Sequence, residues 1–199
     1  MVTARRVEVV LDFVCVHSYR GFVRFLRAAR RHRADGGEVE TVLRPFRLAP
    51  EASFTGEPLF EVHKRDRGEA VARAIAADTS LGAADGLEVN LGRAVFVNTF
   101  EAHRLLARAS GAGRGEEMAE RLFRAYFTDG LHIADRTVLD RLAAEVGVVP
   151  GAGGEAELRA ELDRVRELGV RSVPVFRFDD GTVLEGERSE EAFLAALRS

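Results

Sequence analysis

The chain contains one cysteine, Cys15, which lies where a short apolar run gives way to a helical pattern. His17 follows two residues later. A thiol attacks as the thiolate, and both a helix N-terminus and a neighbouring imidazolium lower a thiol pKa. The position of Cys15 therefore predicts an activated covalent nucleophile, with His17 able to serve as an acid. The alternative is a small buried cysteine that only packs.

A single cysteine restricts the chemistry in three ways. Within one chain it allows no disulfide, and it excludes a structural zinc site built from paired cysteines. It is also typical of a reducing compartment, so we expect a cytoplasmic protein. The five histidines form no His-x-x-x-His pair and no HExxH arrangement, so we expect neither a metal site nor a required cofactor.

The elements before and after Cys15 have the pattern of a β-α-β unit. Residues 7–14 are apolar and rich in β-branched side chains, which predicts a strand. A helical stripe and a second strand over residues 39–43 follow, so the two strands should be parallel. The apolar stripe of the helix consists of Phe22, Phe25, Leu26 and Ala29.

The rest of the chain reads as a helical block followed by a return to strands. A hairpin with an Asp-Gly turn is expected over residues 173–185, and Ser189 should cap a final helix. This order predicts an α/β domain interrupted by a helical insertion. The boundaries we expect place residues 1–56 and 151–199 in the α/β domain and residues 57–150 in the insertion.

Residues 12–21, Asp-Phe-Val-Cys-Val-His-Ser-Tyr-Arg-Gly, resemble the active-site stretch of DsbA-like thioredoxin-fold proteins, particularly the FrnE-like branch. The resemblance implies a thioredoxin fold with an inserted all-helical domain. It also implies that Val173 and Pro174 form the cis-proline pair facing Cys15, with the Val173 backbone offered to a substrate. The similarity continues, in the family's order, over residues 45–50, 98–105, 122–127 and 169–174.

The chain departs from the family motif at the two positions that matter most for redox chemistry. Val16 stands where the family has proline, and Ser18 stands where it has the resolving cysteine. A dithiol oxidase releases its mixed disulfide through that second thiol, so a DsbA-type oxidase role is disfavoured. Glutathione transferase kappa and 2-hydroxychromene-2-carboxylate isomerase belong to the same superfamily and lack the dithiol. By analogy of position, Ser18 should hydrogen-bond the thiolate, or else simply cap the helix.

We therefore expect Cys15 to act on a small unsaturated molecule, most directly in E/Z isomerisation of a conjugated carbonyl compound or polyene. One alternative is a monothiol oxidoreductase or thiol transferase whose mixed disulfide is resolved by glutathione or mycothiol. Another is a non-catalytic binding protein. Asn98 and His103 match a family stretch and should line the substrate cleft, unless they serve only to cap the helix and to bond the backbone.

The expected partners follow from charge and hydropathy. The formal net charge is −3, which makes nucleic acid an unexpected partner. No apolar run reaches the roughly 20 residues of a membrane span, and no secretory signal is expected at the N-terminus. A run of basic residues between Arg24 and Arg33 is a solvated face or, alternatively, a dock for an acidic carrier protein that presents the substrate. The oligomeric state stays open.

Overall fold

The computed structural model describes residues 4–199, which form two compact units. Residues 4–46 and 154–199 make the first unit, and residues 47–153 make the second. The sequence predicted that the second unit would begin at residue 57. In the structure residues 47–56 are grouped with the second unit, and the side chain of Asn98 in that unit donates hydrogen bonds to the carbonyl oxygens of Pro50 and Ala52.

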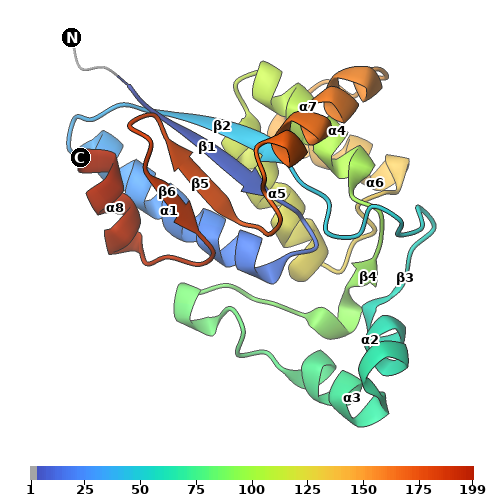
Figure 1. Ribbon diagram of the computed structural model, residues 1–199. Helices are drawn as coiled ribbons and strands as arrows, with labels where there is room; N and C mark the ends of the chain where they lie inside the picture. Colours follow the sequence, from blue (N-terminus) through green and yellow to red (C-terminus); the bar gives the residue numbers. More distant parts are fainter. Residues whose placement is uncertain (1–3) are drawn as a thin grey trace. The chain divides into compact units, whose positions relative to one another are not determined.

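The first unit is built on a four-stranded mixed sheet in the order β2-β1-β5-β6 (Figure 1). Strands β1 (Arg5–Leu11) and β2 (Val39–Pro45) are parallel and are joined by helix α1 (Val16–Ala34). This arrangement confirms the predicted β-α-β unit. Strands β5 (Val175–Phe178) and β6 (Val183–Glu185) form the predicted hairpin, and β5 runs antiparallel to β1.

One face of the sheet packs against α1 and α8 (Glu190–Arg198) through aromatic rings. The ring centroid of Phe176 on β5 lies 5.4 Å from that of Phe25 on α1 and 4.5 Å from that of Phe193 on α8. Ser189 caps α8, as predicted, because its hydroxyl accepts the backbone N–H of Ala192. Burial of three phenylalanines at one point fixes both helices against the centre of the sheet.

The opposite face of the sheet carries a smaller apolar cluster. Side chains alternate across a strand, so Val175 points away from the face that Phe176 occupies. Val175 packs with Val10 of β1 and with Val165 of α7 (Glu155–Glu167). This second cluster includes Cys15, which places the candidate nucleophile beside α7.

Helix α7 is also tied to the sheet by an ion network around Arg44. One nitrogen of this guanidinium lies 2.6 Å from a carboxylate oxygen of Glu8, and another lies 2.9 Å from Glu161 on α7. Burial alone would raise the pKa of Glu8, but the hydrogen bond and the charge of Arg44 outweigh it, and the pKa is lowered. The network therefore keeps Glu8 ionised and links β1, β2 and α7.

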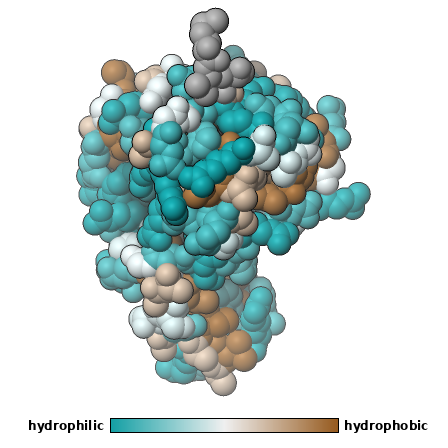
Figure 2. Space-filling view, turned by 90° about the vertical axis from the view of Figure 1, so that its left-hand side faces the viewer, coloured by the Kyte–Doolittle hydropathy of each residue, from teal (hydrophilic) through white to brown (hydrophobic). Residues whose placement is uncertain are grey.

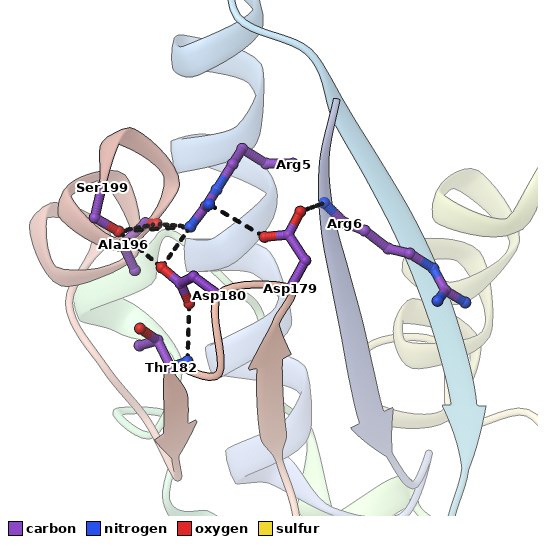
Figure 3. Close-up of polar contacts among 7 residues, drawn as sticks. All are labelled: Arg5, Arg6, Asp179, Asp180, Thr182, Ala196 and Ser199. Atoms are coloured by element: carbon purple, nitrogen blue, oxygen red, sulfur yellow. Dashed lines mark hydrogen bonds and ion pairs between the residues drawn. The ribbon is translucent and has the colours of Figure 1, made fainter. Parts of the chain in front are cut away.

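A second polar network closes the end of the sheet away from Cys15 (Figure 3). Arg5 at the start of β1 donates to Asp180 in the hairpin turn at 2.8 Å and to the carbonyl oxygen of Ala196 on α8 at 3.1 Å. Its other terminal nitrogen lies 3.2 Å from Asp179. One guanidinium thus joins the first strand, the hairpin turn and the last helix.

This network predicts a pH-dependent contribution to stability. Asp180 accepts hydrogen bonds from the Arg5 side chain and from the backbone and side chain of Thr182. These hydrogen bonds hold the pKa of Asp180 well below its ordinary value of 3.8. A depressed pKa stabilises the fold above the unfolded value, and the stabilisation is lost as the pH falls. We expect Asp180→Asn to lower the thermal unfolding midpoint by a few degrees at neutral pH and the difference from wild type to shrink below about pH 4. Thermal unfolding followed by circular dichroism measures both, and a difference that is equally large in acid would contradict the account.

The second unit is mostly helical but contains a small sheet. Strands β3 (Glu57–Pro58) and β4 (Val95–Phe96) pair antiparallel, so the unit differs from the all-helical insertion that was expected. Strands of two residues leave no periodic signal in a sequence. The α-helices of this unit are α2 (Leu59–Arg67), α3 (Glu69–Ala77), α4 (Phe100–Gly111), α5 (Gly115–Phe127) and α6 (Arg136–Val146), and its short 3-10 helices are η1 (Ala83–Asp85) and η2 (Leu91–Arg93).

The surface of the second unit includes an apolar area on α3. Helix α3 is rich in alanine, and its Val71 is 44% exposed. Figure 2 shows a brown and tan area at the lower end of the view, where Figure 1 places α3. Among residues 4–199, no helix has the length and apolar character needed to cross a bilayer.

Candidate active site

Cys15 is the N-cap of α1. Its backbone is extended, with φ −98° and ψ 111°, and its Sγ accepts the backbone N–H of Ser18 at 3.4 Å. A cap satisfies one of the amides that the first turn of a helix leaves unpaired. The predicted position of the thiol at a helix N-terminus is therefore correct. Ser18 lies within the first turn and is not the cap, contrary to the alternative that the sequence left open.

The sulfur lies in an apolar pocket of the first unit. Cys15 is 7% exposed and packs with Val10, Val165, Val173 and Val175. Its thiol donates to the carbonyl oxygen of Val173 at 3.6 Å. This contact joins the start of α1 to a segment more than 150 residues away in the sequence.

The segment that contacts the sulfur contains a cis peptide bond between Val173 and Pro174. This is the geometry that the family resemblance implies at these positions. Gly21 of α1 lies against the proline, because a Cβ at Gly21 would be 3.0 Å from Pro174 Cγ. A residue without a side chain is what allows α1 to approach the proline this closely. Val173 and Pro174 therefore form one wall beside Cys15.

Burial raises the pKa of the Cys15 thiol above its ordinary value of 9.0. Hydrogen bonds from the Ser18 side chain and from the backbone of Ser18 and His17 lower this pKa, but burial outweighs them, and the charge of Asp12 raises it further. The expectation of an activated thiolate is therefore not met. At neutral pH the sulfur holds its proton.

Asp12 is a site residue that the sequence analysis did not single out. It is 0% exposed at the end of β1, and its carboxylate accepts the backbone N–H of Phe13 at 2.8 Å. The backbone N–H of Asp12 donates to the Ser18 hydroxyl at 3.4 Å, so the two buried polar residues are connected beside the sulfur. The signals in the sequence were a carboxylate at the end of a mostly apolar run and its place at the start of the stretch that resembles the family's active site.

The side chain of His17 is directed to a different partner. Its imidazole is 65% exposed, and Nδ1 lies 2.6 Å from a carboxylate oxygen of Glu187. Arg20 contacts the same carboxylate at 2.9 Å. His17 therefore lowers the pKa of Cys15 through a hydrogen bond from its backbone N–H. The charge of its ring, which the sequence suggested as a cause, does not contribute to the change in that pKa.

Asn98 and His103 belong to the second unit and are buried there. Asn98 is 2% exposed, and its carboxamide oxygen accepts the first amide of α4, from Phe100, at 3.0 Å. Its amide nitrogen donates to Pro50 and to Ala52, each at 3.0 Å. Every side-chain polar atom of Asn98 is therefore used within its own unit. His103 lies on α4 and is 1% exposed.

The described residues offer no evident metal centre. Among residues 4–199, histidine, cysteine, aspartate and glutamate side chains form no group of three or more suited to holding a metal ion. The site supplies the sulfur of Cys15, the buried hydroxyl of Ser18 and the buried carboxylate of Asp12.

A thioredoxin-type sheet with a cysteine at the N-terminus of its first helix and a cis-proline opposite defines a thioredoxin-fold protein. A family model for the DSBA-like thioredoxin domain matches residues 6–198, so the chain belongs to this family. The match covers both units, which agrees with the resemblance drawn from the sequence.

The solved structures that resemble this chain include a probable oxidoreductase and an isomerase. The chain is similar to the crystal structure of a probable DsbA oxidoreductase from Streptomyces coelicolor, with 28% identity, a TM-score of 0.84 and coverage of 97% of this chain and 88% of that one. It is 26% identical to the uncharacterized protein YwbO of Bacillus subtilis, over 96% of this chain and 94% of the relative. A structure of 2-hydroxychromene-2-carboxylate isomerase shares the fold at 13% identity, with a TM-score of 0.62 and coverage of 96% and 92%.

The environment of Cys15 predicts how its reactivity depends on pH. Because burial raises the thiol pKa, the rate of alkylation by iodoacetamide should keep rising through pH 9.0, the ordinary thiol value. Ser18→Ala should slow alkylation at a given pH, and Asp12→Asn should speed it up, since these residues respectively lower and raise the pKa. Mass spectrometry of the folded protein measures these rates. A plateau below about pH 8 in the wild type would contradict the account.

His17→Ala provides the matched comparison for these variants. It removes the exposed ring but keeps the backbone N–H that faces the sulfur. We expect its alkylation profile to lie closer to wild type than that of Ser18→Ala does. A larger effect of His17→Ala than of Ser18→Ala would contradict this account, because it would show that the imidazole lowers the thiol pKa, as the sequence suggested.

Asn98 should contribute to stability rather than to turnover. Asn98→Ala leaves the carbonyl oxygens of Pro50 and Ala52 and the amide of Phe100 without this partner. Unsatisfied buried groups of this kind cost free energy, so we expect a loss of about 2 kcal/mol in urea unfolding. Unchanged stability together with weaker substrate binding would assign Asn98 to the substrate instead.

Proposed function

We propose that this protein is a single-thiol enzyme in which Cys15 adds covalently to a small unsaturated substrate and catalyses E/Z isomerisation of a conjugated carbonyl compound or polyene. One observation carries the proposal. The sulfur of Cys15 is buried among apolar side chains, and the position of a resolving thiol is occupied by the hydroxyl of Ser18. Such a site can form a covalent adduct. Because the sequence contains no second thiol to displace it, the adduct is released by the reverse of the reaction that formed it.

The proposed reaction uses the sulfur and its own proton. Sulfur bonds to the β-carbon of the conjugated system, and the thiol proton moves to the carbonyl oxygen to give an enol. The former double bond is now single and rotates. Elimination breaks the carbon–sulfur bond, restores the double bond in the other geometry and returns the proton to sulfur. Atoms and electrons balance, and no oxidant or external thiol takes part.

The burial of Cys15 favours this addition over thiol–disulfide exchange. Exchange proceeds through a thiolate, so a proton must leave the apolar pocket and a charge must form within it. Addition to a carbonyl-conjugated double bond transfers the proton to the substrate, and the net charge of the pocket stays the same. The carboxylate of Asp12 opposes a second negative charge nearby.

The proposal assigns a role to each residue around the sulfur. Val173 and Pro174 form the wall against which the substrate lies, and the hydroxyl of Ser18 hydrogen-bonds the sulfur as the adduct forms and breaks. His17 is an outer residue that acts through its backbone. Asn98 and His103 support the second unit and are not required for the covalent step.

Thiol–disulfide exchange is the second candidate. It is favoured by the similarity to the probable DsbA oxidoreductase from Streptomyces coelicolor. In that case Cys15 would attack a disulfide, and glutathione or mycothiol would resolve the mixed disulfide. Both candidates are compatible with a cytoplasmic location, where a lone cysteine stays reduced. Both also allow a substrate that is presented by an acidic carrier protein to the basic residues of α1.

The two candidates differ in what they do with simple probes. We expect the wild type to accelerate isomerisation of a cis-enone such as (Z)-4-phenylbut-3-en-2-one, followed by ultraviolet absorbance, and Cys15→Ala to abolish the acceleration. A panel of cis-enones and cis-dienoic esters should be screened with both proteins. If Cys15→Ala performs as well as wild type on every responsive compound, the covalent mechanism is excluded. If only glutathione disulfide reacts, the second candidate replaces it.

Ser18→Cys is a gain-of-function control for the redox alternative. It restores a second thiol within one helical turn of Cys15, at a position whose amide already contacts the sulfur. We expect this variant to expel glutathione from a preformed Cys15 mixed disulfide, whereas the wild type keeps it until an external thiol is added. Isomerisation of the enone by the fully reduced variant should be slower than by the wild type, because the variant lacks the hydroxyl that hydrogen-bonds the sulfur. Equal release by both proteins would show that the hydroxyl does not determine the chemistry.

A further inference from the structure

The second unit contains a cavity that the proposed chemistry of Cys15 does not use. It has a volume of about 300 Å³ and opens between α4, α6 and the segment at Gly151 and Ala152. Three arginines line it, Arg104, Arg108 and Arg136, together with two carboxylates. The lining therefore carries more positive than negative charge.

Two of the arginines have carboxylate partners on their own helices. Arg104 lies 3.3 Å from Glu101 on α4, and Arg136 lies 3.7 Å from Asp140 on α6. These pairs account for both carboxylates of the lining. The remaining charge belongs to Arg108.

Arg108 is the half-buried cation of this cavity. Within residues 4–199, its guanidinium has neither a carboxylate partner nor a hydrogen-bond acceptor. A guanidinium that has lost part of its hydration and has five N–H donors favours an oxyanion, which it binds through two parallel hydrogen bonds. The cavity is therefore built around a cation whose partner is not supplied by the described chain.

The exposed backbone of Gly151 and Ala152 lines the cavity beside Arg108. Gly151 lies directly against the guanidinium, since a Cβ at Gly151 would be 3.4 Å from Arg108 Cζ and 3.5 Å from Nε. In the described part of the chain, the amides of Gly151 and Ala152 donate to no acceptor. The lack of a side chain at Gly151 keeps the guanidinium and the backbone within reach of one small ligand.

We propose that this cavity binds a phosphate group, either free phosphate or a phosphate monoester. The guanidinium of Arg108 donates hydrogen bonds to two oxygens of the phosphate, and the amides of Gly151 and Ala152 donate to a third oxygen. A carboxylate has only two oxygens, which the guanidinium would occupy, so it uses fewer of the donors. The site is independent of Cys15 and gives the second unit a ligand of its own.

Inorganic phosphate is the probe for this site. In chloride buffers of constant ionic strength, phosphate should raise the thermal unfolding midpoint of the full chain saturably, and acetate should do so less. Arg108→Gln should weaken phosphate binding about tenfold or more, as measured by isothermal titration calorimetry. Arg114→Gln removes a charge in the same unit outside the cavity lining and should bind phosphate as the wild type does.

A spectroscopic measurement on the wild type covers the case in which Arg108→Gln fails to fold. The amide resonances of Gly151 and Ala152 should shift with added phosphate and saturate with the calorimetric affinity. The proposal is overturned if these resonances do not move, if Arg108→Gln binds as tightly as Arg114→Gln, or if acetate binds as well as phosphate.

Discussion

The sulfur atom of Cys15 caps the N-terminus of α1. Most helices use the oxygen of serine, threonine, aspartate or asparagine to accept the first free amides, but here Cys15 accepts the amide of Ser18 and donates its own proton to the carbonyl oxygen of Val173. The sulfur thus joins the end of β1, the first turn of α1 and the cis-proline segment. The position of each of these segments depends on the others, and so does the apolar pocket that surrounds the thiol.

The same arrangement determines which chemistry is available. A helix N-terminus favours negative charge, typically by about 0.3–1 kcal/mol, whereas removal of an ionised group from water costs several kcal/mol. At Cys15 the effect of burial is the larger of the two, and the pKa of the thiol is raised. A buried neutral thiol is a poor partner for disulfide exchange, but it can add to a double bond if its proton goes to the substrate. In the proposed addition, the hydroxyl of Ser18 hydrogen-bonds the sulfur and does not displace the adduct.

Much of the fold could be predicted from the sequence. Alternating and continuous apolar runs identified β1 and β2, an Asp-Gly pair identified the hairpin, and Ser189 identified the start of α8. These signals are local, so a single sequence contains them. Strands β3 and β4 were missed because two residues are too few for a period. The contact of Asn98 with Pro50 joins residues 48 positions apart, and no local pattern indicates it.

The position of Cys15 at the N-terminus of α1 could be predicted, but the surroundings of its sulfur could not. The burial of Cys15 comes from residues near positions 165–175, and the partner of His17 is Glu187, 170 residues away in the sequence. The role of Asp12 depends on its burial beside Ser18. The most direct test of the account is an ultraviolet titration of the thiolate of this single-cysteine protein, with Cys15→Ser as the blank. The account predicts no appreciable thiolate absorbance at neutral pH and a titration midpoint above pH 9.0, the ordinary thiol value. A thiolate already formed at neutral pH would contradict it.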